Sequence, residues 1–98
     1  IGVDSNQNYM QPGTMLTSMY KKVGLAAYNS FAAAVAGNWE AGFSVNGVAE
    51  DGVGAAMDEY NADLVSADML AAVDAARAAI ISGDIVVHDY MSDNSCPL

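Results

Sequence analysis

Residues 66–87 read SADMLAAVDAARAAIISGDIVV, and this stretch decides the fold class. Its apolar residues recur every three or four positions, which predicts a helix from about 67 to 82. Ser66 is a favourable N-cap, and Gly83 is placed to end the helix in the left-handed conformation. Residues 85–87 follow at once and predict a strand. A helix that leads directly into a strand is typical of an α/β fold.

Strands and a second helix are also predicted upstream of this unit. Residues 1–3 predict a buried strand that runs into a polar loop. Apolar residues three and four apart predict a helix over residues 14–36, with Thr14 as its N-cap. Residues 43–48 predict another strand, and a short strand is expected within 53–57. We therefore expect an α/β chain with a mostly parallel sheet.

Composition limits the classes of function open to this chain. Its 98 residues are enough for one domain, and 53% of them are hydrophobic, so the composition is not that of a disordered chain. Twelve acidic residues oppose three basic ones, and the net charge is −9. Because nucleic acids and anionic membrane surfaces repel such a chain, neither is expected as a partner. A single cysteine, Cys96, without a Cys/His cluster predicts no zinc site.

Four stretches of the chain form a recognisable series: IGVDSNQ at residues 1–7, LTSMYKKV at 16–23, GVG at 52–54 and IISGDIVV at 80–87. In this order they resemble motifs of the basic membrane protein (BMP) family of solute-binding proteins, whose characterised members bind purine nucleosides. One departure is Gly24, where the family usually has Asp. Each match alone is weak, but their order over most of the chain makes the resemblance fairly specific.

The resemblance implies a type I periplasmic-binding-protein fold, in which two α/β lobes close on a solute about a hinge. This chain would be its C-terminal fragment: residues 1–44 in the second lobe, 45–54 crossing the hinge, and 55–98 returning to the first lobe and the tail. The parent protein would be lipid-anchored on the periplasmic or extracellular face of the cytoplasmic membrane and would deliver a purine nucleoside to an ABC transporter permease. The alternative is a ligand-sensing or regulatory domain of the same fold.

Four residues are candidates for solute binding. Asp4 follows the first strand, where ligands of open α/β sheets bind, and its carboxylate could accept two hydrogen bonds from a ribose diol. The resemblance gives Lys21 a sugar-contacting role, and Ser18 and Gln7 could add polar contacts. The alternatives are a loop Asp that caps its own backbone, a solvated helix Lys, a hydroxyl local to the helix N-terminus and an amide that forms the turn.

No residue pattern in the chain predicts catalysis. The single histidine, His88, has no nucleophile at a recognisable spacing, and no phosphate-binding loop or metal motif is present. Trp39 could stack on a base, but a packing role is the more common one. We therefore expect a binding protein that is not an enzyme and needs no cofactor. A fragment with unpaired sheet edges and an uncovered face is also expected to self-associate.

Overall fold

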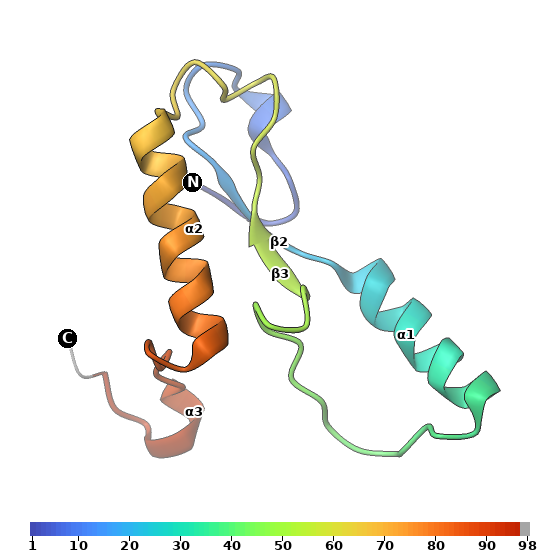
Figure 1. Ribbon diagram of the computed structural model, residues 1–98. Coiled ribbons are helices and arrows are strands. Elements are labelled where there is room, and N and C mark those ends of the chain that lie inside the picture. Colours follow the sequence, from blue (N-terminus) through green and yellow to red (C-terminus); the bar gives the residue numbers. More distant parts are fainter. Residues whose placement is uncertain (97–98) are drawn as a thin grey trace.

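The computed structural model describes residues 1–96, and it shows a small mixed α/β chain (Figure 1). Three short strands form one sheet, two longer helices lie outside it, and a further short helix follows near the C-terminus. The elements are β1 (Gly2–Asp4), the 3-10 turn η1 (Asn8–Met10), β2 (Ser18–Lys21), α1 (Val23–Ala36), β3 (Val53–Ala55), α2 (Ala67–Ser82) and α3 (Tyr90–Asp93).

The sheet has the order β1-β2-β3 and is mixed. β1 and β2 are parallel, with Asp4 beside Tyr20. β2 and β3 are antiparallel, with Tyr20 beside Gly54. The expected mostly parallel sheet is therefore wrong, because the central strand makes one pairing of each kind. The parallel pair still brings the carboxyl ends of β1 and β2 to one edge of the sheet, where open α/β sheets bind ligands.

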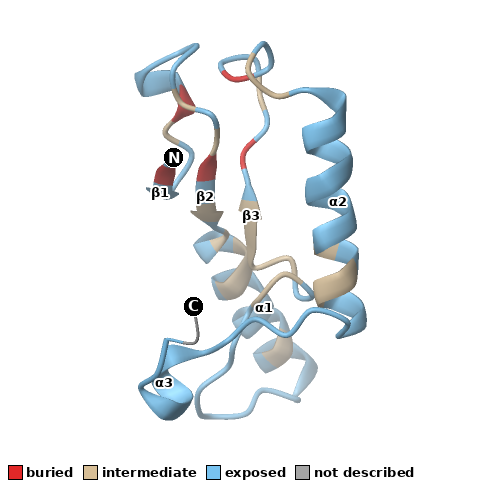
Figure 2. Ribbon diagram, turned by 90° about the vertical axis from the view of Figure 1, so that its left-hand side faces the viewer, coloured by how far each residue is buried: buried red, intermediate tan, exposed pale blue. Residues whose placement is uncertain are grey.

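Side-chain hydrogen bonds hold the other end of the sheet together. Asn8, Ser18 and Asn61 are fully buried, and we call them the buried polar cluster (Figure 2). The Ser18 hydroxyl donates to Asn8 Oδ1 at 2.8 Å, and Asn61 Nδ2 donates to the carbonyls of Leu16 and Ala56 at 2.8 and 2.9 Å. Within residues 1–96 every buried side-chain nitrogen or oxygen has a partner. The cluster thus binds the loop after β1 to the start of β2 and to the segment after β3.

The predicted helix of residues 67–82 is confirmed as α2 (Ala67–Ser82). The Ser66 hydroxyl accepts a hydrogen bond from the Met69 amide at 3.2 Å, and Gly83 has a φ of 85°. Both end signals therefore act as the sequence predicts, because they depend only on neighbouring residues. The short strand expected within 53–57 is confirmed as β3.

The predicted helix of residues 14–36 is wrong in its first third. Thr14 caps no helix, residues 18–21 form β2, and α1 begins only at Val23. The burial of Ser18 explains the change, because its side chain pairs with Asn8 while the backbone that follows pairs with β1 and β3. The predicted end is confirmed: α1 stops at Ala36, and Gly37 adopts the left-handed conformation with a φ of 75°.

Two predicted strands are absent from the described residues. Residues 43–48 form a loop and a turn, and residues 85–87 have no strand partner. Ile85 instead donates its backbone amide to the carbonyl of Ala79 in α2, at 3.0 Å. A strand needs a neighbour to satisfy its backbone, and neither segment pairs with β1, β2 or β3. Residues 97–98 of the predicted tail lie outside the described residues.

The helices are attached to the sheet at few points. α1 extends away from β2 as an arm, whereas α2 runs alongside the sheet (Figure 1). Neither helix contains a buried residue.

In the part of the chain that the structure describes, no helix combines the length and the apolarity of a membrane span.

Candidate functional site

The candidate site is an open depression at the carboxyl ends of β1 and β2. Its volume is about 450 Å³. Asp4, the last residue of β1, and Lys21, the last residue of β2, both line it. The other lining residues are Ser5, Asn6, Tyr20, Ala56 and Met57. The structure therefore brings together Asp4 and Lys21, two of the four residues predicted to bind a solute, although Lys21 lies on a strand and not on the predicted helix.

An ion pair joins the two residues. Lys21 Nζ lies 2.7 Å from Asp4 Oδ1, and the side chains are 55% and 66% exposed. An exposed ion pair contributes at most about 1 kcal/mol, because water screens it and holding two long side chains in place costs entropy. A solute that offers hydroxyl groups could therefore exchange contacts with either partner at little cost. Asp4 also has a φ of 72°, so its backbone turns the chain away from β1 at this point.

Tyr20 is the residue of the depression that the sequence analysis missed. Its ring covers the backbone of Gly54 on the neighbouring strand, where an added Cβ would lie 2.8 Å from the Tyr20 hydroxyl. Lys22 Nζ lies 5.8 Å from the ring centroid. Gly54 and Lys22, the neighbours of the ring, do not line the depression, and the side chains of successive residues of β2 point to opposite faces of the sheet. Tyr20 therefore borders the depression, but its ring lies on the other face from the Lys21 side chain. The sequence shows an aromatic residue directly before Lys21. Its position at the depression could be predicted only if residues 18–21 were recognised as a strand.

Ser18 and Gln7 do not line the depression. Ser18 is fully buried; its Oγ accepts a hydrogen bond from the Gln7 amide at 3.0 Å and donates to Asn8. Gln7 Nε2 donates to the carbonyl of Val3 at 3.1 Å. Asn6, the neighbour of Gln7, lines the depression instead. The side chains of Ser18 and Gln7 are thus hydrogen-bonded to β1 and to the loop that follows Asp4, and not to the depression.

A carboxylate beneath this loop fixes its position. Asp58 accepts hydrogen bonds from Asn6 at 2.6 Å and from Asn8 at 3.2 Å. The hydrogen bond from Asn6 is the main cause that lowers the pKa of Asp58, with smaller contributions from the amides of Tyr60 and Asn61 and from Asn8. The loop after β1 is therefore tied to the segment after β3 by two side-chain hydrogen bonds, the first of which is exposed to solvent.

A second ionic cluster lies at the start of α1. Asp51 pairs with Lys22 and also with Arg77 of α2, the latter at 3.2 Å. The hydrogen bond from Lys22 and then that from Arg77 lower the pKa of Asp51. All three basic residues of the chain are thus engaged, Lys21 at the depression and the other two at Asp51.

His88 and Trp39 lie away from the candidate site. His88 Nε2 lies 3.3 Å from Asp93 and 3.0 Å from the carbonyl of Ser95, near the C-terminus. Trp39 follows the end of α1 and lines a different hollow, beside that helix. Between residues 1 and 96 no three His, Cys, Asp or Glu side chains are grouped to hold a metal ion. Neither residue can therefore act with Asp4 and Lys21 in the arrangement that the structure shows.

Comparison with models of known protein families and with curated proteins found no match to this chain.

Proposed function

We propose that the chain forms part of a solute-binding protein for a neutral, hydroxyl-rich small molecule, a purine nucleoside, taken up through an ABC transporter. The observation that supports the proposal most is the exposed Asp4–Lys21 pair in a depression beside Tyr20. The depression also lies at the carboxyl edge of a parallel strand pair, which is the usual ligand edge of α/β sheets.

The chemistry of the pair suits a cis-diol. A carboxylate can accept two hydrogen bonds, so Asp4 could accept one from each of the two ribose hydroxyl groups, while Lys21 donates a hydrogen bond to a hydroxyl oxygen. Only one oxygen of Asp4 is held by Lys21, and the side chain is more than half exposed, so the second oxygen is accessible to a solute.

The wider proposal rests on the order of the BMP-like stretches. In it, residues 1–44 belong to one lobe, 45–54 cross the hinge, and 55–98 return to the other lobe. Closure of the two lobes would then be a population shift caused by solute contacts with both of them. The protein would be lipid-anchored outside the cytoplasmic membrane and would dock on its permease there. Residues that hold the base would lie on parts of the protein that this chain does not contain.

Calorimetric titration of the two-lobed protein with inosine, adenosine and 2′-deoxyadenosine tests the proposal. We expect the ribonucleosides to bind and the deoxy form to bind more weakly. The reason is that removing the 2′-hydroxyl leaves an acceptor on Asp4 unsatisfied once the site closes, at a cost of roughly 1–3 kcal/mol. That cost corresponds to about a 5- to 150-fold loss of affinity.

Variants assign the effect to the depression. Asp4→Ala and Lys21→Ala should each weaken inosine binding, and Asp4→Ala should also remove the difference between adenosine and its deoxy form. Lys22→Ala is the matched control, because Lys22 is the next residue but pairs with Asp51 outside the depression. Nucleoside binding that survives the double variant Asp4→Ala, Lys21→Ala would refute the site, and no binding of any nucleoside would refute the proposed solute.

A further inference from the structure

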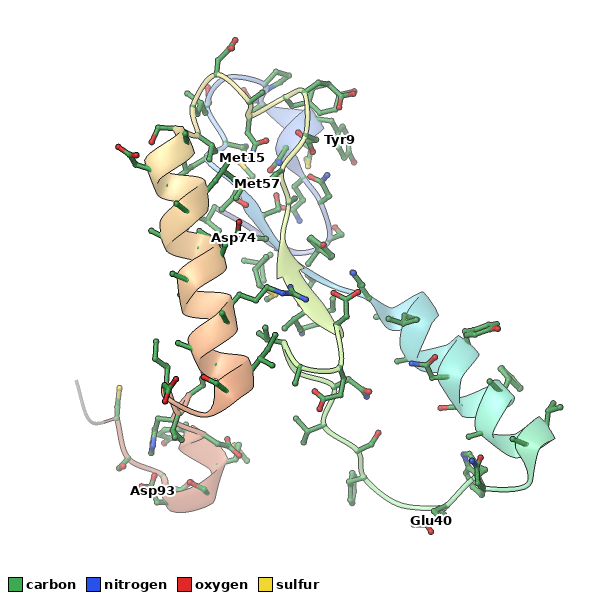
Figure 3. The ribbon with its side chains drawn as sticks, viewed as in Figure 1. Tyr9, Met15, Glu40, Met57, Asp74 and Asp93 are labelled. Carbon is green, nitrogen blue, oxygen red and sulfur yellow. The ribbon has the colours of Figure 1, made fainter. Side chains whose placement is uncertain are left out.

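The arm formed by α1 is the least charged part of an otherwise strongly acidic chain. Residues 23–39 contain no Asp, Glu, Lys or Arg, and this is the longest such stretch in the sequence. The next charged residue, Glu40, lies beyond the far end of the helix (Figure 3). The helix has 14 residues and none of them is buried. Isolated helices of this length are marginal in water, so α1 needs a surface to pack against.

One face of α1 is apolar and uncovered. Tyr28, Phe31 and Val35 are 69%, 75% and 91% exposed and lie on one side of the helix at spacings of three and four. They border a shallow hollow together with Ala32 and Ala36. The opposite side of the helix borders a different hollow, which it shares with the loop at residues 38–46. The face of Tyr28, Phe31 and Val35, here called the arm face, therefore has no cover from residues 1–96 of its own chain.

The total exposed area of the chain is larger than that of a compact monomer of the same mass. It exposes 7415 Å², whereas a compact monomer of 10.1 kDa exposes roughly 5,300 Å². The excess is roughly 2,100 Å², and a standard protein interface removes only about 800 Å² from each partner. The excess of the whole chain is therefore larger than the area that one partner loses in a standard interface.

We propose that the arm face is the contact through which two copies of this chain pair, α1 against α1. Two copies with a charge of −9 each repel one another, and the arm is where they can meet without bringing charges together. α2 is less suitable because it carries Asp68 and Asp74 along its length. This inference does not depend on the proposed nucleoside site, which lies on β1 and β2.

The order of residues along the arm face fits an antiparallel pair with two-fold symmetry. Gly24, Tyr28, Phe31 and Val35 are spaced by four, three and four, a pattern that is the same in both directions. A two-fold axis therefore sets Tyr28 of one copy beside Phe31 of the other, and Gly24 beside Val35. A Cβ at Gly24 would meet nothing within 4 Å, so there is space for the larger residue. Three steps over these residues average about 3.7 residues, close to the 3.6-residue turn of a straight helix, so all four lie on one side of α1.

Sedimentation velocity of the 98-residue chain over a wide range of concentrations tests the pairing. We expect a concentration-dependent dimer. Phe31→Asp should raise its dissociation constant about thirtyfold or more, the effect of losing a central aromatic contact. Ser30→Asp is the matched control, because it adds the same charge to an exposed position on the other side of the same helix, and it should leave the dimer within a few-fold of the wild type.

Circular dichroism shows whether each variant keeps its helices. If Phe31→Asp loses helix as a monomer, Tyr28→Asp on the same face replaces it in the comparison. The proposal is overturned by a chain that stays monomeric at every concentration. It is equally overturned by equal effects of Phe31→Asp and Ser30→Asp, and by larger oligomers that ignore both variants, since these would point to association along the sheet edges.

Discussion

The two ends of β2 lead into regions that are organised in opposite ways. At its beginning, Ser18 joins Asn8 and Asn61 in the buried polar cluster, where every side chain is fixed by named hydrogen bonds. At its end, the chain passes into α1, a regular helix without a buried residue. The first region has almost no regular structure and is well packed, and the second is regular and hardly packed at all. Regular secondary structure and burial are therefore separate properties in this chain.

The difference shows which forces act in each region. In the polar cluster, the amides satisfy backbone carbonyls that no strand reaches, and losing one of them leaves buried groups without partners. In α1, the intrahelical hydrogen bonds and the high helix propensity of Ala act without help from packing. Changes to side chains should therefore matter much more in the cluster than on the arm of a single copy.

The largest effect is expected at Asn61. Asn61→Ala removes the hydrogen bonds to the carbonyls of Leu16 and Ala56 and the acceptor for the Asp58 amide. At roughly 1–3 kcal/mol for each buried group left unsatisfied, the free energy of unfolding should fall by about 3 kcal/mol. Urea unfolding measures the change. Asn29→Ala, an exposed amide on α1, should change stability very little, and equal losses in the two variants would remove the distinction between the regions.

A pair of glycine substitutions should have effects of opposite sign. A Cβ at Gly2 would lie 2.4 Å from Ser18 Oγ and 3.0 Å from Ser18 Cβ, so Gly2→Ala should destabilise the chain by about 1–3 kcal/mol. In a single copy a Cβ at Gly24 meets nothing, and Ala is the better helix former, so at concentrations where the chain is monomeric Gly24→Ala should stabilise α1 by roughly 0.5–1 kcal/mol. Thermal unfolding followed by circular dichroism measures both. Destabilisation by Gly24→Ala would show that α1 is already packed at that point.

The smallest effect concerns Asp51, which links α2 to the start of α1. Lys22 and Arg77 lower the pKa of Asp51 in the folded chain. The ion pairs of Asp51 with these two residues therefore stabilise the fold above the unfolded pKa of about 4. That contribution is lost as the pH falls through the lower folded value. The stability of the wild type should therefore exceed that of Asp51→Asn near neutral pH, and the gap should close in acid. Urea unfolding at several pH values measures it, and a gap that widens in acid would contradict the assignment.

The sequence predicted what depends on neighbouring residues. α2 was predicted from one end to the other, because the Ser66 cap, the apolar period and Gly83 act within a few residues. β2 was missed because Met19, Tyr20 and Val23 fit a helical spacing equally well. Only the pairing with β1 and β3, which are distant in the sequence, makes residues 18–21 a strand.

Part of the candidate site was predictable for a similar reason. Asp4 and Lys21 were each singled out from the sequence, and the structure places them 2.7 Å apart. Ser18 was expected to contact a solute, but its hydroxyl is buried against Asn8, a partner that apolar patterns do not reveal. Tyr20 was missed with the strand that carries it. Polar residues that pair across the fold leave no periodic pattern in the sequence. The contacts of the buried polar cluster and of the candidate site could therefore not be predicted from sequence periodicity.

The pairing of all three basic side chains has a consequence for solute charge. Lys21 is held by Asp4, and Lys22 and Arg77 are both held by Asp51, in a chain whose net charge is −9. A phosphorylated solute that approaches this chain meets an overall negative potential, and it would have to separate an existing ion pair to gain a cation. For the solute proposed above, this charge distribution would favour uncharged molecules over nucleotides before any single contact with the sugar or the base is made.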